Sequence, residues 1–444
     1  MMKSQLSILL NLLWTLKFVV LVGFNFSAVA VTIDEAFNKS VEVDPVLRSS
    51  RFNQQATSEN KVIASSRLLP QIMLQGSSNQ LTQTTTQEVL GAASLSRSFT
   101  GPSINHQLVI RQALIRHKDI SALKLAEYQN QYSEIKYLSD FSELWMRVAY
   151  AYIDLIGAQQ IVEAYKKPLS NMLDAAKQEK VRFEKGDGTK DSAGEAEALY
   201  QQAKAYYAQA KQSLWAKQRH FEIITQIEAA RLKEIKLTLK IKSTMALENQ
   251  VDAWIEYKEK SNELRLAQLQ IEMQKERLKM AKAENMPVLD LLASWNIAKN
   301  DATSTQGYRY KNNQIGVQYS MPLFAGGGIT AGERQAAKTL EASMEDAVAI
   351  SNKVESEFNI LWSTVQGLIA RADAHYHLTE SAKVQIKANT LSYKNGVKTI
   401  NDIANAEALE SRRIVEQINL IIELQKNLIK LKRSTAYITN YETK

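Results

Sequence analysis

The tract from Gln314 to Gly328 constrains the fold more than any other part of this chain. Apolar residues alternate along it with polar or small ones, which is the period-2 pattern of a β-strand between two environments. The apolar set is Ile315, Val317, Tyr319 and Met321, and the other is Gln314, Gly316, Gln318 and Ser320. Pro322 then ends ladder pairing, and three glycines precede a long helical pattern. We therefore expect a strand with lipid on one face and water on the other, leading directly into a long helix.

The first 30 residues are typical of an export signal. Lys3 supplies positive charge, residues 6–22 are mostly apolar, and Ala28-Val29-Ala30 is a small-x-small cleavage site. A retained membrane anchor is the alternative, but the uncharged stretch after Lys17 is too short to span a bilayer. We expect residues 1–30 to be a signal peptide.

Composition excludes several classes of function. No later segment approaches the roughly 20 apolar residues of a membrane helix, so membrane contact requires strands or an amphipathic surface. The chain has no cysteine, which excludes disulfides and thiol chemistry, and its net charge of +8 is spread out, which argues against nucleic acid. His375 and His377 point to different helix faces, and no phosphate loop, nucleophile elbow or zinc-protease motif is present. We expect neither an enzyme nor a cofactor.

The chain is internally duplicated. A Leu-Arg pair precedes a proline by 23 residues in each half, at Leu47 and Pro70 and again at Leu264 and Pro287. Each proline closes a helical pattern and opens two candidate strands separated by a polar loop. The expected strands are 71–81, 106–112, 288–298 and 314–321, and the expected loops are 82–103 and 299–313.

A long helical segment follows each pair of strands and ends at a glycine turn. The distance from Ala113 to Gly186 is 73 residues, and that from Pro322 to Gly396 is 74. About 70 helical residues make a rod of about 105 Å, and Pro168 is expected to kink or interrupt the first rod. The chain therefore divides into a signal peptide (1–30), a first repeat (31–218), an inter-repeat segment (219–243), for which a belt of short helices is one interpretation, and a second repeat (244–444).

Four strands cannot form a membrane barrel alone. Lipid offers no water to an open sheet edge, and barrels begin at roughly eight strands, so two or three chains must share one barrel. Polar helices suited to line a water-filled tube favour three chains and twelve strands. On the third strand, the outward set is Leu289, Leu291, Ala293, Trp295 and Ile297, and the opposite set is Asp290, Ser294 and Asn296. A soluble sheet capped by helices is the alternative.

These patterns resemble the outer membrane factors, the TolC-type efflux and type I secretion channels. The resemblance rests on the duplication, the two helix turns and the run Pro322-Leu323-Phe324-Ala325-Gly326-Gly327 after the fourth strand. It implies an α+β membrane protein: a homotrimer with a 12-stranded β-barrel in the outer membrane lipid of a Gram-negative cell. A long α-helical coiled-coil tunnel would continue the barrel across the periplasm. The tunnel would give passive export and open like an iris when a periplasmic adaptor and an ABC-type or proton-driven inner-membrane transporter are recruited.

In this family the entrance lies at the two helix turns. The resemblance assigns Tyr393 and Lys398 to a latch that holds the entrance closed, and Lys398 stands where arginine is usual. A lysine forms no bidentate fork, so the latch should be weaker. Asp402 matches the first aspartate of a carboxylate ring and Asn405 stands at the second. A trimer would then have three ring carboxylates instead of six, with weaker cation binding.

The first turn contains Gly186 and Gly188, and Asp191 is the expected partner of Tyr393 or Lys398. The alternative is that the turn residues only cap helices. On this interpretation Thr399-x-x-Asp402 and Ser192-x-x-Glu195 are capping boxes, and Gly186 and Gly396 are C-terminal caps.

A periplasmic coiled-coil adaptor or structural protein is the other candidate class. An adaptor needs compact β-domains flanking one helical hairpin, whereas this chain has two hairpin-like halves and amphipathic strands, which favours a channel. Among channels, the Gly186-Asp187-Gly188 turn and the lack of a lipid-anchor cysteine favour protein secretion over efflux of drugs or metals.

Overall fold

The computed structural model describes residues 32–88, 90–91, 93–229, 254–255, 257–258, 261–301, 308–395 and 397–432. The chain divides into two compact units. The first comprises Met1–Asp44, Trp145–Ile241 and Ile369–Gln425, and the second comprises Pro45–Leu144, Lys242–Leu368 and Lys426–Lys444. The expected signal peptide and most of the expected inter-repeat segment lie outside the described residues.

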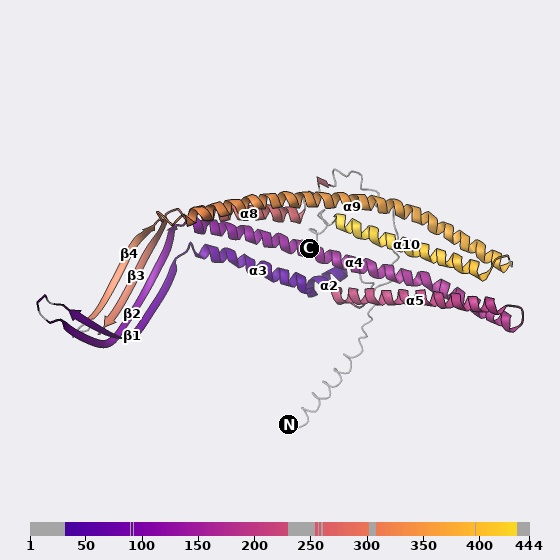
Figure 1. The fold of residues 1–444 in the computed structure, drawn as a ribbon, viewed down its shortest axis with the longest axis horizontal. Coiled ribbons are helices and arrows are strands. Elements are labelled where there is room, and N and C mark those ends of the chain that lie inside the picture. Colours follow the sequence, from indigo (N-terminus) through magenta and orange to yellow (C-terminus); the bar gives the residue numbers. More distant parts are fainter. Residues whose placement is uncertain are drawn as a thin grey trace, which may run out of the picture. The chain divides into compact units, whose positions relative to one another are not determined.

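A four-stranded antiparallel sheet belongs to the second unit. Its strands are β1 (Gln71–Gln87), β2 (Leu95–Ile115), β3 (Val288–Asn300) and β4 (Tyr308–Ser320), in the order β1-β2-β3-β4 (Figure 1). The four expected strands are confirmed, but each is longer than the alternating hydrophobic pattern indicates.

The prediction of a loop at 82–103 is wrong, because β1 and β2 continue through most of these residues. Hydroxyl side chains replace the apolar ones there. Cross-strand hydrogen bonds join Thr82 to Thr100 at 2.9 Å, Thr84 to Ser98 at 3.1 Å and Thr86 to Ser96 at 3.2 Å. Threonine is β-branched and fits a pleated sheet although it is polar. The loop expected at 299–313 is likewise too long, because β4 begins at Tyr308.

Long helices complete the second unit. These are α3 (Pro45–Ser66), α8 (Asn262–Ala283) and the first parts of α4 (His117–Glu184) and α9 (Gly328–Lys394). Trp254, Tyr257 and Phe358 pack as an aromatic cluster with ring centroids 5.1–6.1 Å apart. Trp362 extends the cluster along α9, and Leu431 is buried against it. This cluster is a small hydrophobic core, because an elongated array of helices cannot enclose a large one.

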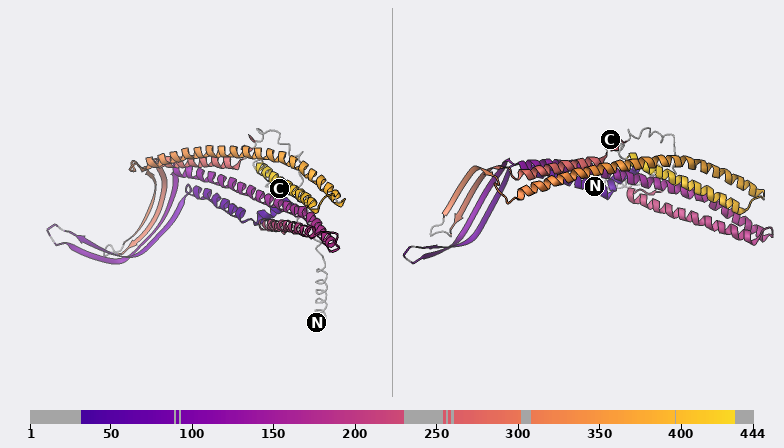
Figure 2. Two further views of the ribbon diagram at one scale, coloured as in Figure 1. Left: turned by 45° about the vertical axis from the view of Figure 1, so that its right-hand side comes forward. Right: turned by 45° about the horizontal axis from the view of Figure 1, so that its top comes forward.

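The first unit is entirely helical where it is described. It contains α2 (Ile33–Val43), α5 (Lys190–Thr225), α10 (Ile400–Lys432, except its last residues) and the later parts of α4 and α9. In both views of Figure 2, α5 lies beside the end of α4 and α10 beside the end of α9. Helix α5 runs past residue 218 because Phe221 is fully buried, with its ring 6.2 Å from that of Tyr152.

Helix α4 continues through Pro168, so the expected interruption is wrong. A proline in a helix interior loses a backbone hydrogen bond and costs about 3 kcal/mol relative to alanine. Side-chain packing before and after Pro168 stabilises the helix. The Tyr165 ring stacks on that of Tyr206 at 5.9 Å, and Met172 is buried against α10. None of the described helices has an 18-residue window apolar enough to cross a membrane.

Candidate functional site

The register of the sheet sorts its side chains into two faces, because directly opposed residues point to the same side. One face carries a row of apolar residues that are paired across all four strands: Ile72, Ile110, Ala293 and Ile315. The opposite face presents amides at a neighbouring level, through Gln75, Gln107, Asn296 and Asn312. The sheet therefore has an apolar face and a polar face, as the sequence predicted.

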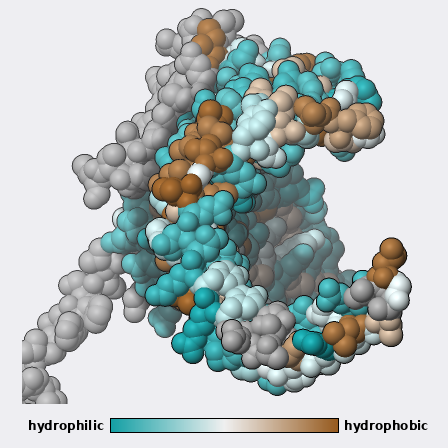
Figure 3. Space-filling view, turned by 90° about the vertical axis from the view of Figure 1, so that its left-hand side faces the viewer, coloured by the Kyte–Doolittle hydropathy of each residue, from teal (hydrophilic) through white to brown (hydrophobic). Residues whose placement is uncertain are grey.

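Among the described residues, nothing covers the apolar face. Ile72 is 68% exposed, Ile315 77% and Val317 60%. Figure 3 views the molecule from the side of the sheet and shows apolar patches beside hydrophilic surface. Isolated exposed apolar residues are ordinary, but a contiguous apolar sheet face requires another molecule or lipid to cover it.

A buried ionic cluster fixes the connection between β2, β3 and α4. Asp290 on β3 is 2% exposed, and its carboxylate accepts hydrogen bonds from Arg111 Nε at 2.8 Å and from Arg116 Nε and Nη2 at 2.8 and 2.7 Å. Arg116 also contacts Asp119 at 3.4 Å. Sequence reasoning placed Asp290 on the polar face but missed its partners. Two features of the sequence could have identified the partners of Asp290. It is a charged residue in the apolar run Val288–Leu292, and an arginine follows the neighbouring strand β2.

The other connection between strand and helix lies where the Pro322–Gly327 run was expected to form a joint. β4 ends at Ser320 and α9 begins at Gly328. Gly326 and Gly327 have φ of 60° and 80°, a left-handed conformation that glycine adopts without steric cost. The side chains of Leu323 and Phe324 are 92% and 88% exposed, which extends the apolar surface beyond the strand.

The turn between α4 and α5 is a Schellman motif. The Asp187 amide donates to the Arg182 carbonyl at 2.9 Å and the Gly186 amide to the Phe183 carbonyl at 3.0 Å, with Gly186 at φ 82°. The C-terminal cap predicted at Gly186 is confirmed. The predicted capping box of Ser192 and Glu195 is wrong, because Thr189 caps α5 by accepting from the Ser192 amide at 3.1 Å.

The turn between α9 and α10 has a related geometry, although Gly396 itself lies outside the described residues. The Val397 amide donates to the Ser392 carbonyl at 2.9 Å. The predicted capping box is confirmed, since the Thr399 amide donates to Asp402 at 2.9 Å and the Asp402 amide donates back to Thr399 at 3.3 Å. Hydrogen bonds from the Thr399 backbone and hydroxyl lower the pKa of Asp402, with a smaller effect from Lys398. Asp402 is therefore a carboxylate at neutral pH.

Tyr393 and Lys398 both make polar contacts within the chain, but not with Asp191. The Tyr393 hydroxyl donates to Glu179 Oε1 at 3.0 Å, which also accepts from Arg182 at 3.0 Å. Lys398 donates to the Asn389 amide oxygen at 2.6 Å. The expected partner Asp191 is thus replaced by Glu179 on α4. Sequence spacing could not reveal Glu179, because its proximity depends on α4 packing beside the end of α9.

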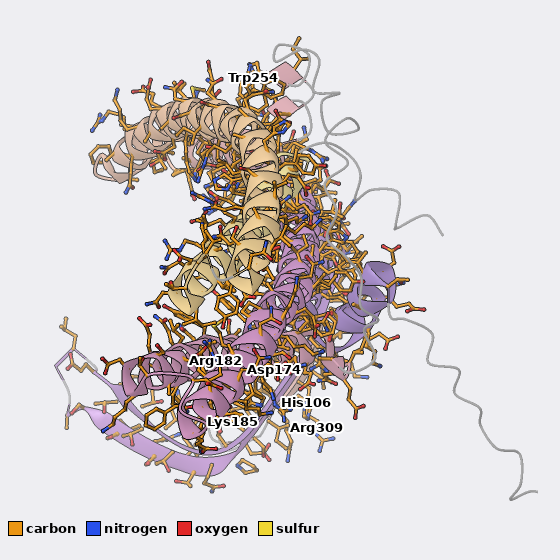
Figure 4. All side chains as sticks on the ribbon, turned by 90° about the vertical axis from the view of Figure 1, so that its right-hand side faces the viewer. His106, Asp174, Arg182, Lys185, Trp254 and Arg309 are labelled. Carbon is orange, nitrogen blue, oxygen red and sulfur yellow. The ribbon has the colours of Figure 1, made fainter. Side chains whose placement is uncertain are left out.

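Partial burial is the main cause that raises the pKa of Tyr393, and the hydrogen bond to Glu179 adds to it. Tyr393 therefore stays protonated and donates to Glu179 at neutral pH. Figure 4 looks onto this end of the helices and labels Asp174 and Arg182 of α4 and Lys185 of the turn that follows it. The region combines charged surface with a partly buried hydrogen bond between α9 and α4.

Helices α4 and α10 are joined by apolar packing and by a buried polar pair. Ile403 and Ala404 pack on Met172, with Leu199, Tyr200 and Ala203 of α5 at the edge of the cluster. Asn171 donates to Glu407 Oε1 at 2.5 Å, while Glu407 Oε2 is buried without a hydrogen-bond partner among the described residues. Asn401 bonds to Glu195 across α5 and α10. Asn405 is exposed on α10, so it is free to face solvent.

Comparison with known proteins agrees with this geometry. Residues 256–436 match the family model described as "Outer membrane efflux protein". The alkaline protease secretion protein AprF of Pseudomonas aeruginosa is 25% identical over 390 residues, covering 86% of this chain and 79% of AprF. The outer membrane protein TolC of Vibrio cholerae is 26% identical over 388 residues, covering 85% and 84%. The MtrE outer membrane channel of Neisseria gonorrhoeae shares the fold, with a TM-score of 0.70, 18% identity and coverage of 91% and 88%.

The fold and the two-faced sheet define an outer-membrane channel protein of a Gram-negative bacterium, suited to efflux or secretion. More specifically, the family model, the relatives and the solved structures support a TolC-type outer membrane factor. Its relatives are channel and secretion proteins and not enzymes.

Proposed function

We propose that three copies of this chain share a 12-stranded barrel in the outer membrane and that a helical tunnel continues it through the periplasm. The observation that supports this most strongly is the sheet itself. Its apolar face is uncovered, and β1 and β4 pair on one side only among the described residues. Lipid cannot satisfy such edges, so neighbouring chains must close the sheet.

The channel acts as a passive duct. In a passive duct the energy for export must come from partners. In this proposal a periplasmic adaptor and an inner-membrane transporter recruit the trimer and deliver the substrate. We favour protein export of the type I kind with an ABC transporter, because two similar proteins are named for protease secretion, AprF and PrtF of Dickeya chrysanthemi. Efflux of small molecules is the second candidate, supported by the description of the matching family model.

The entrance lies at the turns between α4 and α5 and between α9 and α10. The Tyr393–Glu179 hydrogen bond ties the end of α9 to α4, and the Lys398–Asn389 bond holds the loop before α10 to α9. We propose that opening moves α9 and α10 away from α4 in an iris-like motion that breaks the first of these bonds. Asp402 contributes one carboxylate per chain to the entrance, and Asn405 contributes none.

Planar-bilayer recording of the detergent-extracted protein tests the proposal. The expected result is a trimer by light scattering that gives discrete single-channel currents. A matched control is the variant in which Ile315 and Val317 on the apolar face are both changed to Asp, because these charges should prevent membrane insertion. A water-soluble monomer without channel activity would contradict the proposal and favour the coiled-coil adaptor.

A further inference from the structure

The apolar face of the sheet ends in a group of cationic side chains. On β4, Lys311 is paired with Ile297 and Arg309 with Lys299, so all four residues lie on the same face as Trp295 and Ile315. His106 of β2 joins this face because it is paired with Ile297. We call Lys299, Arg309 and Lys311 the basic rim. Figure 4 labels His106 and Arg309 on the sheet.

The basic rim lies at the end of the sheet away from the helices. β4 runs from Tyr308 to Ser320 and only then connects to α9, so Arg309 and Lys311 are near its distal end. On β3 the apolar face extends from Leu289 to Ile297, which is about 26 Å along the strand at 3.3 Å per residue. A strand tilt of about 40° shortens this to about 20 Å of height, which is close to the apolar band of outer-membrane barrels, about 25 Å tall. The rim therefore marks the far border of that band.

Two of the three rim cations have no counter-ion among the described residues. Lys299 pairs with Asp301 at 2.5 Å. No carboxylate pairs with Arg309 or Lys311 in the part of the chain that the structure describes, and both are exposed. The undescribed stretch 302–307 between β3 and β4 reads Ala-Thr-Ser-Thr-Gln-Gly and contains no acid. Residues two apart on a strand are separated by about 7 Å, so both cations can reach the same anionic group or two adjacent ones.

We propose that the basic rim binds phosphate groups of outer-leaflet lipid headgroups. This inference rests on the proposed membrane function, since the same face must be covered by lipid chains. Phosphate is favoured because it is an anion held at the border of the hydrocarbon region, where the rim lies. Arg309 suits this task because its planar guanidinium can make two parallel hydrogen bonds to one phosphate. Binding would anchor the trimer at a fixed depth in the membrane.

Native mass spectrometry of the full trimer, titrated with phosphatidic acid or with phosphatidylcholine, tests the proposal. The variant has both Arg309→Gln and Lys311→Gln. Each juxtamembrane cation attracts anionic lipid, so the preference for phosphatidic acid should fall about tenfold or more. The matched control is Arg97→Gln, an exposed cation of β2 on the opposite face, where Thr85 is its partner. Arg97→Gln should keep the preference, and the charge-conserving pair Arg309→Lys with Lys311→Arg should retain most of it.

Three results would overturn the proposal. The first is an equal preference for phosphatidic acid in the wild type and the double variant, and the second is an equal loss in Arg97→Gln. The third is displacement of bound lipid by inorganic phosphate at the same concentration, which would show a site for a free anion instead. Single-channel recording on the same samples separates the two proposals. If the channel is intact while lipid preference is unchanged, only the rim assignment fails, whereas loss of trimer and current in the wild type refutes the proposed function.

Discussion

Replacing Glu407 by glutamine should remove a pH-dependent weakness between α4 and α10. Glu407 is 4% exposed, one carboxylate oxygen accepts from Asn171, and the other lacks a partner among the described residues. Burial raises the pKa of Glu407 from 4.5 to about 7, against smaller lowering effects of Asn171 and Lys167. The neutral acid is therefore the form that the folded contact prefers.

The sign of the pH dependence follows from this pKa. Between these two pKa values Glu407 is protonated in the folded state and ionised in the unfolded state. Its contribution to the free energy of unfolding is therefore greatest below pH 4.5 and falls as the pH rises to about 7. A rise of this size, at 1.36 kcal/mol per unit, corresponds to about 3 kcal/mol of lost stability above pH 7. Glu407→Gln keeps the acceptor for Asn171 and removes the charge. The variant should be more stable than wild type at pH 8 by about this amount, and similar to it at pH 4.5.

Hydrogen exchange of the intact trimer measures this effect locally, through peptides that cover residues 165–175 and 400–412. After correction for intrinsic exchange rates, wild-type protection should fall between pH 5 and pH 8, and the Glu407→Gln variant should show no such decline. Glu410→Gln is the matched control, because it removes a neighbouring carboxylate of the same helix and should leave most of the decline in place. A flat wild-type profile, or an equal decline in Glu407→Gln, would refute the reasoning.

Three further predictions address the turns and the connection between β2, β3 and α4. Changing Tyr393 to Phe and Lys398 to Ala together removes two bonds of the entrance, so single-channel conductance should rise; unchanged conductance would show that these residues only shape the turn. Thr399→Ala removes the N-cap of α10 and should cost about 1 kcal/mol, detected as faster exchange in the first turn of α10, whereas normal protection there would count against the cap. Asp290→Ala leaves two arginines without their buried partner and should destabilise the connection between β2, β3 and α4 by about 3 kcal/mol, seen as a lower dissociation temperature of the trimer. Wild-type thermal stability of this variant would show that the cluster is dispensable.

The sequence was sufficient to predict the four strands and the two faces of the sheet, because the pattern of apolar residues is periodic. Alternation along Gln314–Met321 and Val288–Ala298 indicates two faces, and the register confirms them. The same method failed for residues 82–103, where threonine and serine pair across strands without any apolar alternation. It was also wrong about an interruption at Pro168, because packing by Tyr165 and Met172 outweighs the local preference of proline, whereas a kink there stays a prediction.

The candidate entrance was predicted only in part. Capping is encoded within a few residues, so Thr399-x-x-Asp402 could be recognised directly. The partner of Tyr393 is 214 residues away in sequence, and no local pattern identifies Glu179. The buried Glu407 was missed for the same reason, since a glutamate on a polar helix looks solvated until α4 packs against it.

Disulfide cross-linking between β1 and β4 tests the shared barrel most directly. The chain has no native cysteine, so introduced pairs are unambiguous. We would combine Met73→Cys on β1 with Asn312→Cys, Gln314→Cys or Gln318→Cys on β4, all on one face of the sheet. Within one chain β2 and β3 lie between these strands, which places them about 14 Å apart, beyond the reach of a disulfide. At one of these registers the account predicts a covalent trimer on a non-reducing gel, and monomer alone at every register would contradict it.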